Sequence, residues 1–213
     1  MGQLTVGVVI GASLLGSTDP ATDEITVTVA ELATLQSLRW AVFAVGVGVA
    51  IKAIGSTRAF LGPFVPTDVV LGLTVGVATQ LVGVSALYWV LELVIGEQDV
   101  DGEAQALFDL ADGPLSTAVL IAVVALGAPL FEELLYRGVL QRALVDRLGT
   151  WPGLVVAAVV FAAVHFQVVQ FPGLLLIGFI LGLLVVRTGR LGPAIWAHVG
   201  FNATTVVVLL AQS

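Results

Sequence analysis

The sequence predicts an all-α fold: a polytopic bundle of about 6–8 membrane-spanning helices around a polar intramembrane cavity. Hydrophobic residues make up 58% of the chain and charged residues 11%, whereas a soluble domain carries about 25% charged residues. Several apolar runs approach or exceed the roughly 20 residues with which a helix crosses a bilayer. The few charged and histidine residues inside these runs predict a cavity, because such groups are costly in lipid. The length favours a single membrane domain over residues 1–213.

The spans are predicted from apolar stretches that Gly, Pro or charged residues separate. They lie at about 38–54, 69–96, 115–135, 151–169, 173–187 and 191–211. A weaker run at 4–16 is short for a span, and no basic residue precedes it, which argues against a standard signal peptide. We expect a slanted or partial first helix there. Glycine and other small residues in 44–50 and 72–85 predict close helix packing.

The charged residues between the runs predict the orientation. Three loops carry the basic pairs Lys52 and Arg58, Arg142 and Arg147, and Arg187 and Arg190. Basic loops face the cytoplasm, and counting alternate crossings puts all three on one side. Seven crossings, with the N-terminus inside and the C-terminus outside, fit nearly every charge; Arg39 is the one basic residue at an outer end.

The composition also limits partners and localisation. The net charge is −7, with no basic patch to neutralise phosphates, so nucleic acid is excluded and the lipid bilayer is the expected partner. There are no cysteines, which excludes disulfides and thiolate catalysis. We expect a multi-pass protein of the cell membrane. The acid-rich, lysine-poor composition favours a prokaryotic source, such as a halophilic archaeon.

The polar loop from Gly96 to Pro114 is predicted to be a solvated connector; a substrate-gating role is the alternative.

The first polar group inside a predicted span is Glu132, Glu133 and Arg137. Residues four apart share a helix face, so Glu133 and Arg137 are placed to form an ion pair. Glu132 points about 100° away and has no local cationic partner. Apolar surroundings make such a carboxylate a stronger base. The alternative is that both glutamates lie at an interfacial helix end.

The other polar groups are His165, preceded by Phe161 one turn earlier, and the pair His198 and Asn202 on one helix face. Taken alone, His165 could be a satisfied core residue, and the pair could tie two helices together. The chain has only two histidines, and both lie in predicted spans downstream of the glutamates. Together the three groups predict one shared polar cavity with a base and oxyanion donors.

Three motifs of this sequence are Glu132-Glu133-x-x-x-Arg137, Phe161-x-x-x-His165 and His198-x-x-x-Asn202. In order and spacing they resemble the three motifs of the CAAX-protease and bacteriocin-processing family (CPBP, or Abi). This family of intramembrane proteases includes the type II CAAX prenyl endopeptidases. The resemblance covers about 115–212 as a catalytic core. It implies that Glu132 and His165 hold and activate the attacking water. It further implies that His198 and Asn202 stabilise the oxyanion, with Glu133, Arg137 and Phe161 in support.

The resemblance leaves the cofactor open. Glu132, His165 and His198 could bind Zn²⁺ with an open fourth position. A metal-free mechanism uses the same residues and is favoured here, because the chain lacks the H-E-x-x-H zinc motif.

The predicted function is therefore an intramembrane endopeptidase that cleaves a membrane-associated or lipidated peptide or protein. One alternative is a catalytically inactive immunity or scaffold relative. A proton-coupled transporter is another, although no internal repeat is evident.

The depths of the two histidines conflict with straight helices. At 1.5 Å per residue, a helix from Trp151 puts His165 about 21 Å from the inner face, whereas one from Leu191 puts His198 only about 10 Å from it. Some helices must therefore be tilted, broken or begin outside the hydrocarbon. Gly127-Ala128-Pro129 is a plausible break.

Overall fold

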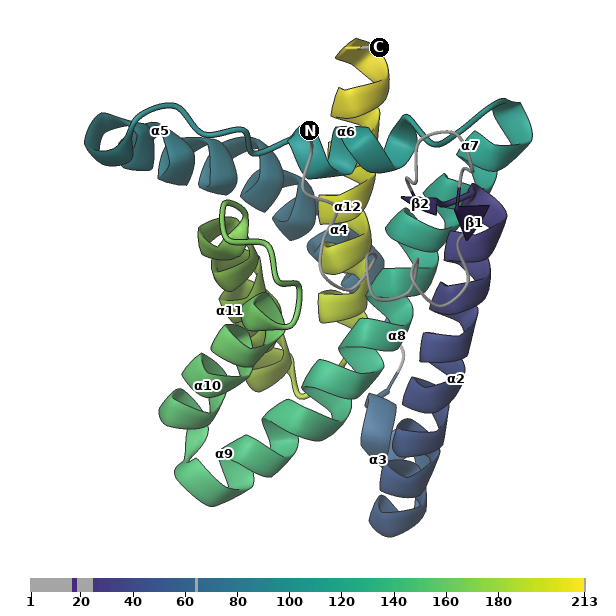
Figure 1. The fold of residues 1–213 in the computed structure, drawn as a ribbon. Coiled ribbons are helices and arrows are strands. Elements are labelled where there is room, and N and C mark those ends of the chain that lie inside the picture. The colour runs from purple at the N-terminus through teal and green to yellow at the C-terminus, as the bar shows by residue number, and fades with distance from the viewer. Residues whose placement is uncertain (1–16, 19–24, 64, 213) are drawn as a thin grey trace.

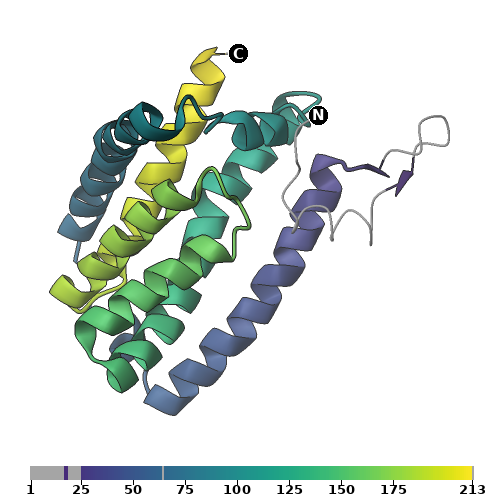
Figure 2. The same ribbon diagram turned by 60° about the vertical axis from the view of Figure 1, so that its left-hand side comes forward.

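A computed structural model describes residues 17–18, 25–63 and 65–212. The described chain is almost wholly helical, as predicted, and the weak run at 4–16 lies outside it. A two-stranded antiparallel pairing of β1 (Ser17–Thr18) and β2 (Ile25–Thr26) precedes the helices. Figures 1 and 2 show the helices gathered in one bundle with α2 along one side.

The helices follow one another with few long connections. In chain order they are α2 (Val29–Ile54), α3 (Thr57–Leu61), α4 (Thr67–Ala78), η1 (Thr79–Val84), α5 (Ser85–Ile95), α6 (Gly102–Phe108), α7 (Pro114–Ile121), η2 (Ala122–Gly127), α8 (Ala128–Leu135), η3 (Tyr136–Gln141), α9 (Arg142–Leu148), α10 (Thr150–Ala163), α11 (Phe171–Thr188) and α12 (Gly192–Gln212). The segments named η are π-helical turns within longer helices.

Five stretches of the described chain are long and apolar enough to cross a membrane. They are α2, Thr67–Ile95, Pro114–Leu148, α11 and α12. α10 is a shorter apolar helix. With α10 counted, the described helices reach the lower end of the predicted range, and the polytopic helical bundle is confirmed.

Three predicted boundaries were wrong. The first described span begins at Val29 rather than near 38, because Thr28 and Glu31 form a capping box: each side chain bonds the other's backbone N–H, at 3.3 and 2.8 Å. The span predicted at 115–135 continues to Leu148. The span predicted at 151–169 ends as a helix at Ala163, so His165 lies in a turn beyond it.

The expected break at Gly127-Ala128-Pro129 is a distortion instead. The helix continues through Pro129, and the turn before it, η2, is π-helical. Proline cannot donate a backbone hydrogen bond to the preceding turn, and a π-helical turn accommodates such a local irregularity. The long helix Pro114–Leu148 therefore reaches the glutamates without interruption.

The three basic loops lie at the same end of the bundle, as the alternate-crossing count predicted (Figure 1). Arg142 donates to the carbonyls of Ala59 and Phe60, which joins the first and second loops. Leu191 N donates to Leu61 O at 3.0 Å, which joins the first and third. The connection from α5 through α6 to α7 runs across the opposite end (Figure 1). Which end faces the cytoplasm stays a prediction.

Close packing of α4 on α12 positions one wall of the site. A Cβ atom at Gly76 would collide with the backbone carbonyl of Ala197, and one at Gly72 would lie 2.7 Å from Pro193 O. Small residues were predicted to serve this purpose in 72–85, and at these two positions they do. Gly48, in the 44–50 segment, does not allow close packing of this kind, because no atom lies within 4 Å of the position that a Cβ atom would take.

Candidate active site

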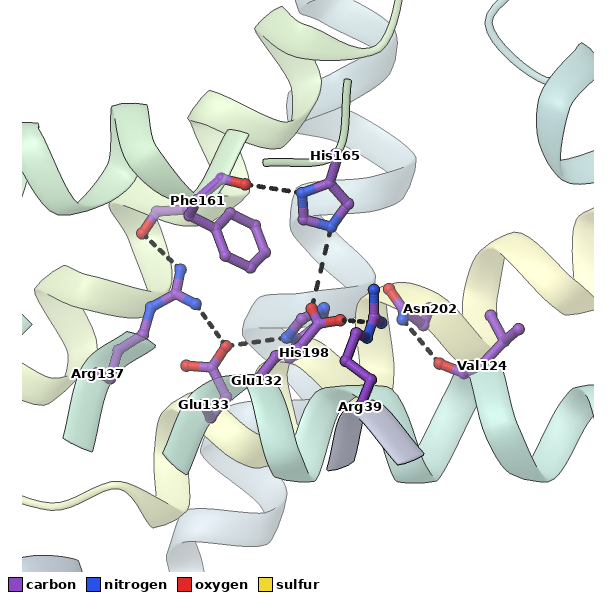
Figure 3. Close-up of polar contacts among 10 residues, drawn as sticks. Arg39, Val124, Glu132, Glu133, Arg137, Phe161, His165, His198 and Asn202 are labelled. Atoms are coloured by element: carbon purple, nitrogen blue, oxygen red, sulfur yellow. Dashed lines mark hydrogen bonds and ion pairs between the residues drawn. The ribbon is translucent and has the colours of Figure 1, made fainter. Parts of the chain in front are cut away.

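Glu132 and Glu133 are neighbours on α8, and their side chains belong to two different networks of hydrogen bonds and ion pairs. Their side chains are buried, 9% exposed for Glu132 and 0% for Glu133. Figure 3 shows them on the same helix, with an arginine and a histidine near each. The predicted shared cluster of Glu132, Glu133, Arg137, Phe161, His165 and His198 is thus present.

Glu133 is the centre of the inner network. Its Oε1 accepts a hydrogen bond from Nη1 of Arg137 at 2.7 Å, which is the predicted ion pair, and lies 2.9 Å from Nδ1 of His198. A carboxylate can only accept, so Nδ1 of His198 carries a proton. Nε2 of His198 is then the ring nitrogen left for other partners.

Arg137 is almost wholly buried, and its guanidinium has partners on two other helices besides Glu133. Its Nη2 donates to the carbonyl of Gly178 on α11 at 3.0 Å, and its guanidinium lies 4.3 Å from the ring centroid of Phe161. Breaking a buried pair of this kind costs about 3–5 kcal/mol, because the remaining charge has no compensation. The inner network is therefore a fixed part of the bundle.

Glu132 is the centre of the outer network. Its Oε1 lies 3.3 Å from Nη2 of Arg39 on α2, and its Oε2 lies 3.9 Å from Nε2 of His165. The sequence predicted no local partner for this carboxylate; the partner comes from 93 residues away. The 3.9 Å separation is too long for a direct hydrogen bond, so both atoms remain available to a third group.

Phe161 brings the two histidines to one place. Its carbonyl lies 2.7 Å from Nδ1 of His165. Since a carbonyl only accepts, that nitrogen carries the proton and Nε2 is directed towards Glu132 (Figure 3). The Phe161 ring packs edge-on against both imidazoles, with centroids 4.9 Å from His165 and 5.7 Å from His198. His165 lies in the turn that follows the end of α10 at Ala163.

Asn202 makes a contact that ties two helices. Its Nδ2 donates to the carbonyl of Val124 in η2 at 2.8 Å. Pro129 has no N–H for a carbonyl one turn earlier, and Asn202 supplies a donor within that turn. The helix-tying alternative for Asn202 is thus realised, and the amide keeps a second N–H.

A cavity of about 370 Å³ joins these groups. It is lined by residues of α2, α6, the Pro114–Leu148 helix, α10, the following turn, α11 and α12, among them Gln36, Arg39, Glu132, Phe161, His165, His198 and Asn202. The polar intramembrane cavity predicted from the sequence is present.

The connector between α5 and α7 forms part of the cavity wall. Ala104 and Leu107 of α6 line the cavity. Glu103 of α6 accepts a hydrogen bond from Gln167 at 2.6 Å, and the Val100 carbonyl accepts one from Gln170 at 2.9 Å. The segment predicted to be a solvated connector therefore also packs against the turn that carries His165.

Comparison with known families agrees with this geometry. Residues 114–204 match the family model described as Type II CAAX prenyl endopeptidase Rce1-like. This segment, less than half of the chain, is similar to that family. Comparisons with curated proteins and with solved structures gave no match. The matched segment holds both glutamates, both histidines and Asn202, and with the five apolar stretches it makes the chain an integral membrane protein.

The three residues that could bind zinc, Glu132, His165 and His198, all line the cavity. Among the described residues, no group of three His, Cys, Asp or Glu side chains is gathered to hold a metal ion. One oxygen of Glu132 faces the guanidinium of Arg39. The histidines make their hydrogen bonds through Nδ1, which leaves Nε2 of each ring for other partners. A cation bound to Glu132 would stand beside the positive charge of Arg39.

Arg39 and Gln36 are the site residues that the sequence did not indicate. Both lie on α2, before the Rce1-like segment, and both line the cavity. Arg39 was placed at an outer helix end because the first described span was predicted to start near 38. The capping box of Thr28 and Glu31 was the signal that would have placed Arg39 inside the helix.

Proposed function

We propose that this protein is an intramembrane endopeptidase that hydrolyses a peptide bond in a membrane-associated or lipidated peptide or protein. The supporting observation is the pair Oε2 of Glu132 and Nε2 of His165, 3.9 Å apart on the cavity wall. One water, at about 2.8 Å from each atom, fits between an acceptor pair at this separation. Both acceptors then polarise the same water towards a carbonyl carbon.

Glu132 acts as the general base. As the water oxygen bonds to the scissile carbonyl carbon, one water proton passes to Glu132, and the carbonyl π electrons move to its oxygen. When the tetrahedral intermediate collapses, the C–N bond breaks. Glu132 returns the proton to the departing amine, so the base is regenerated.

His198 and Asn202 stabilise the oxyanion. With both ring nitrogens protonated, His198 donates to the oxyanion through Nε2, while its Nδ1 stays on Glu133 at 2.9 Å. The second N–H of Asn202 is the other donor, while the first stays on Val124. Arg137 and Phe161 keep Glu133 and the two imidazoles in place.

The mechanism that we propose needs no metal. The pairing of Glu132 with Arg39 supports it, because a guanidinium and a divalent cation compete for one carboxylate. Zinc bound by Glu132, His165 and His198 is the alternative, and it places a divalent cation close to Arg39.

The experiment is a comparison of N-terminal and C-terminal peptides in cells that carry the wild-type protein or Glu132→Ala at equal abundance. We expect new termini in the wild-type cells that lie within or next to membrane-associated segments. Cells carrying Lys52→Ala, a change at the exposed end of α2, should show the wild-type termini. If no terminus differs between wild type and Glu132→Ala, the inactive immunity or scaffold role replaces the protease.

A further inference from the structure

The turn that carries His165 has a strained backbone. It joins α10 to α11 over residues 164–170. Phe166, directly after His165, has a φ of 56°, and among the described residues it alone has a positive φ without being glycine. A bulky side chain adopts this left-handed region at a cost, and such a residue persists where the surrounding structure holds it. The Phe166 side chain is 62% exposed, so packing of its ring does not offset that cost.

The first half of this turn is held by α10. The backbone N–H groups of His165 and Phe166 donate to the carbonyls of Ala162 and Ala163, at 3.3 and 3.1 Å. The His165 imidazole is bonded to the Phe161 carbonyl. These contacts end at Phe166, so the second half of the turn depends on other elements.

The second half is held by Tyr88 of α5. The Tyr88 hydroxyl donates to the carbonyl of Val169 at 2.6 Å, across 81 residues of sequence. Tyr88 is 6% exposed, and its ring lies against Gly173 near the start of α11, where an added Cβ atom would be 3.3 Å from the ring. Figure 1 shows the connection between α10 and α11 beside α5. Packing on α11 therefore fixes the direction in which the phenol meets the turn.

The connector between α5 and α7 adds two contacts of another kind. Gln167 donates to the Glu103 carboxylate and Gln170 to the Val100 carbonyl, both through their side chains. Tyr88 bonds to the backbone of the turn instead, and it does so from the apolar stretch Thr67–Ile95. In apolar surroundings a backbone carbonyl without a donor is costly, so this bond favours one position of the turn.

We propose that Tyr88 is a positioning residue that holds the turn of residues 164–170, and with it His165, against the strain at Phe166. Without the hydroxyl, the backbone at Phe166 relaxes towards negative φ, and the turn moves relative to Glu132. The catalytic consequence rests on the proposed function, in which His165 holds the attacking water. The anchoring of the turn does not, and it can be measured without a substrate.

The first test measures the mobility of the turn with a spin label on the full chain in lipid nanodiscs. The chain has no cysteine, so Val168→Cys gives one labelling site, and the Val168 side chain is 88% exposed. We expect Tyr88→Phe to raise the population of the mobile component in the electron paramagnetic resonance spectrum roughly three- to tenfold. This is the factor that corresponds to the net strength of one hydrogen bond. An unchanged spectrum overturns the proposal.

Thr79→Val is the matched control for loss of a hydroxyl. Thr79 lies in the same apolar stretch, Thr67–Ile95, and its hydroxyl donates to the Val75 carbonyl of the preceding turn at 2.8 Å. The label at position 168 should give the wild-type spectrum in this variant. An equal rise of the mobile component in Thr79→Val and Tyr88→Phe contradicts the proposal, because general loosening of the bundle would then explain both.

The second test concerns the strain at Phe166. The effect of Tyr88→Phe is measured again in chains that carry Phe166→Gly or Phe166→Ala. Glycine adopts positive φ without steric cost, whereas alanine removes the ring and keeps the Cβ atom. We expect Tyr88→Phe to mobilise the turn fully beside Phe166→Ala and only weakly beside Phe166→Gly. Equal effects in the two chains contradict the proposal, because strain at Phe166 would then play no part.

The third test uses a substrate found by the comparison of termini. Tyr88→Phe should lower kcat roughly three- to tenfold with little change in KM, because the change acts on the water-holding group rather than on substrate binding. Adding Phe166→Gly should restore part of kcat, and adding Phe166→Ala should not. A mobile turn with an unchanged kcat overturns the positioning role. If wild type and Glu132→Ala show no difference in termini, the proposed function fails, and the spin label still decides whether Tyr88 anchors the turn.

Discussion

Nδ1 of His198 lies 2.9 Å from Oε1 of Glu133, the oxygen that also accepts from Arg137. The sequence assigned Glu133 to Arg137 alone. With both partners on one oxygen, Glu133 fixes the proton on Nδ1 of His198 and leaves Nε2 for the cavity. The buried pair is thus joined directly to a residue proposed to stabilise the oxyanion.

Glu133→Gln should both destabilise the protein and abolish cleavage. The change leaves the buried Arg137 without its counter-charge, which costs about 3–5 kcal/mol. We expect a large fall in Tm in detergent. The double variant Glu133→Gln, Arg137→Met should recover much of that Tm, because no uncompensated charge remains, but not the cleavage rate. A double variant no more stable than Glu133→Gln would show that the pair is not the source of the loss.

Asn202→Ala should lower stability as well as activity. The carbonyl of Val124 loses its donor at 2.8 Å, and this part-buried acceptor, left unsatisfied, costs at most about 1–3 kcal/mol. Thr204→Ala is the control, because Thr204 bonds only to the Gly200 carbonyl of its own helix in the described structure. An unchanged Tm for Asn202→Ala would remove the helix-tying role and leave oxyanion stabilisation alone.

Gly76→Ala should be strongly destabilising although alanine favours helix. A methyl group at Gly76 collides with the backbone of Ala197, next to His198, so α4 and α12 must separate. Gly48→Ala is the matched control on α2, where nothing lies within 4 Å of the added methyl group. It should raise the free energy of unfolding by up to about 1 kcal/mol and should not lower Tm. Equal Tm values for the two variants would contradict the close packing of α4 and α12.

Removal of metal ions should leave activity unchanged. Protein dialysed against a strong zinc chelator should cleave its substrate at the original rate, and elemental analysis should find well below one zinc per chain. This follows from the pairing of Glu132 with Arg39. Loss of activity on chelation, restored by zinc, would favour the metal alternative.

The sequence predicted much of the fold because the bilayer imposes simple rules. Long apolar runs and basic loops predicted the helical bundle and the shared end of the three loops. The pair Glu133 and Arg137 was predictable because four residues of helix bring the two side chains together.

Long-range relations were not predictable in the same way. The contact between Arg39 and Glu132 depends on the packing of α2, and that of Asn202 with Val124 depends on a π-helical turn that hydropathy does not reveal. The turn at His165 was missed because the apolar run continues past the end of α10.

The most direct measurement is the cleavage rate of Glu132→Gln beside that of wild type, with Tm recorded on the same samples. Glutamine fills the same space but cannot take a proton from water, and loss of a general base costs about 10²–10⁴ in rate. The account predicts a fall of that size with Tm nearly unchanged, because the pair with the half-exposed Arg39 adds little stability. A Glu132→Gln protein that cleaves at the wild-type rate would contradict it.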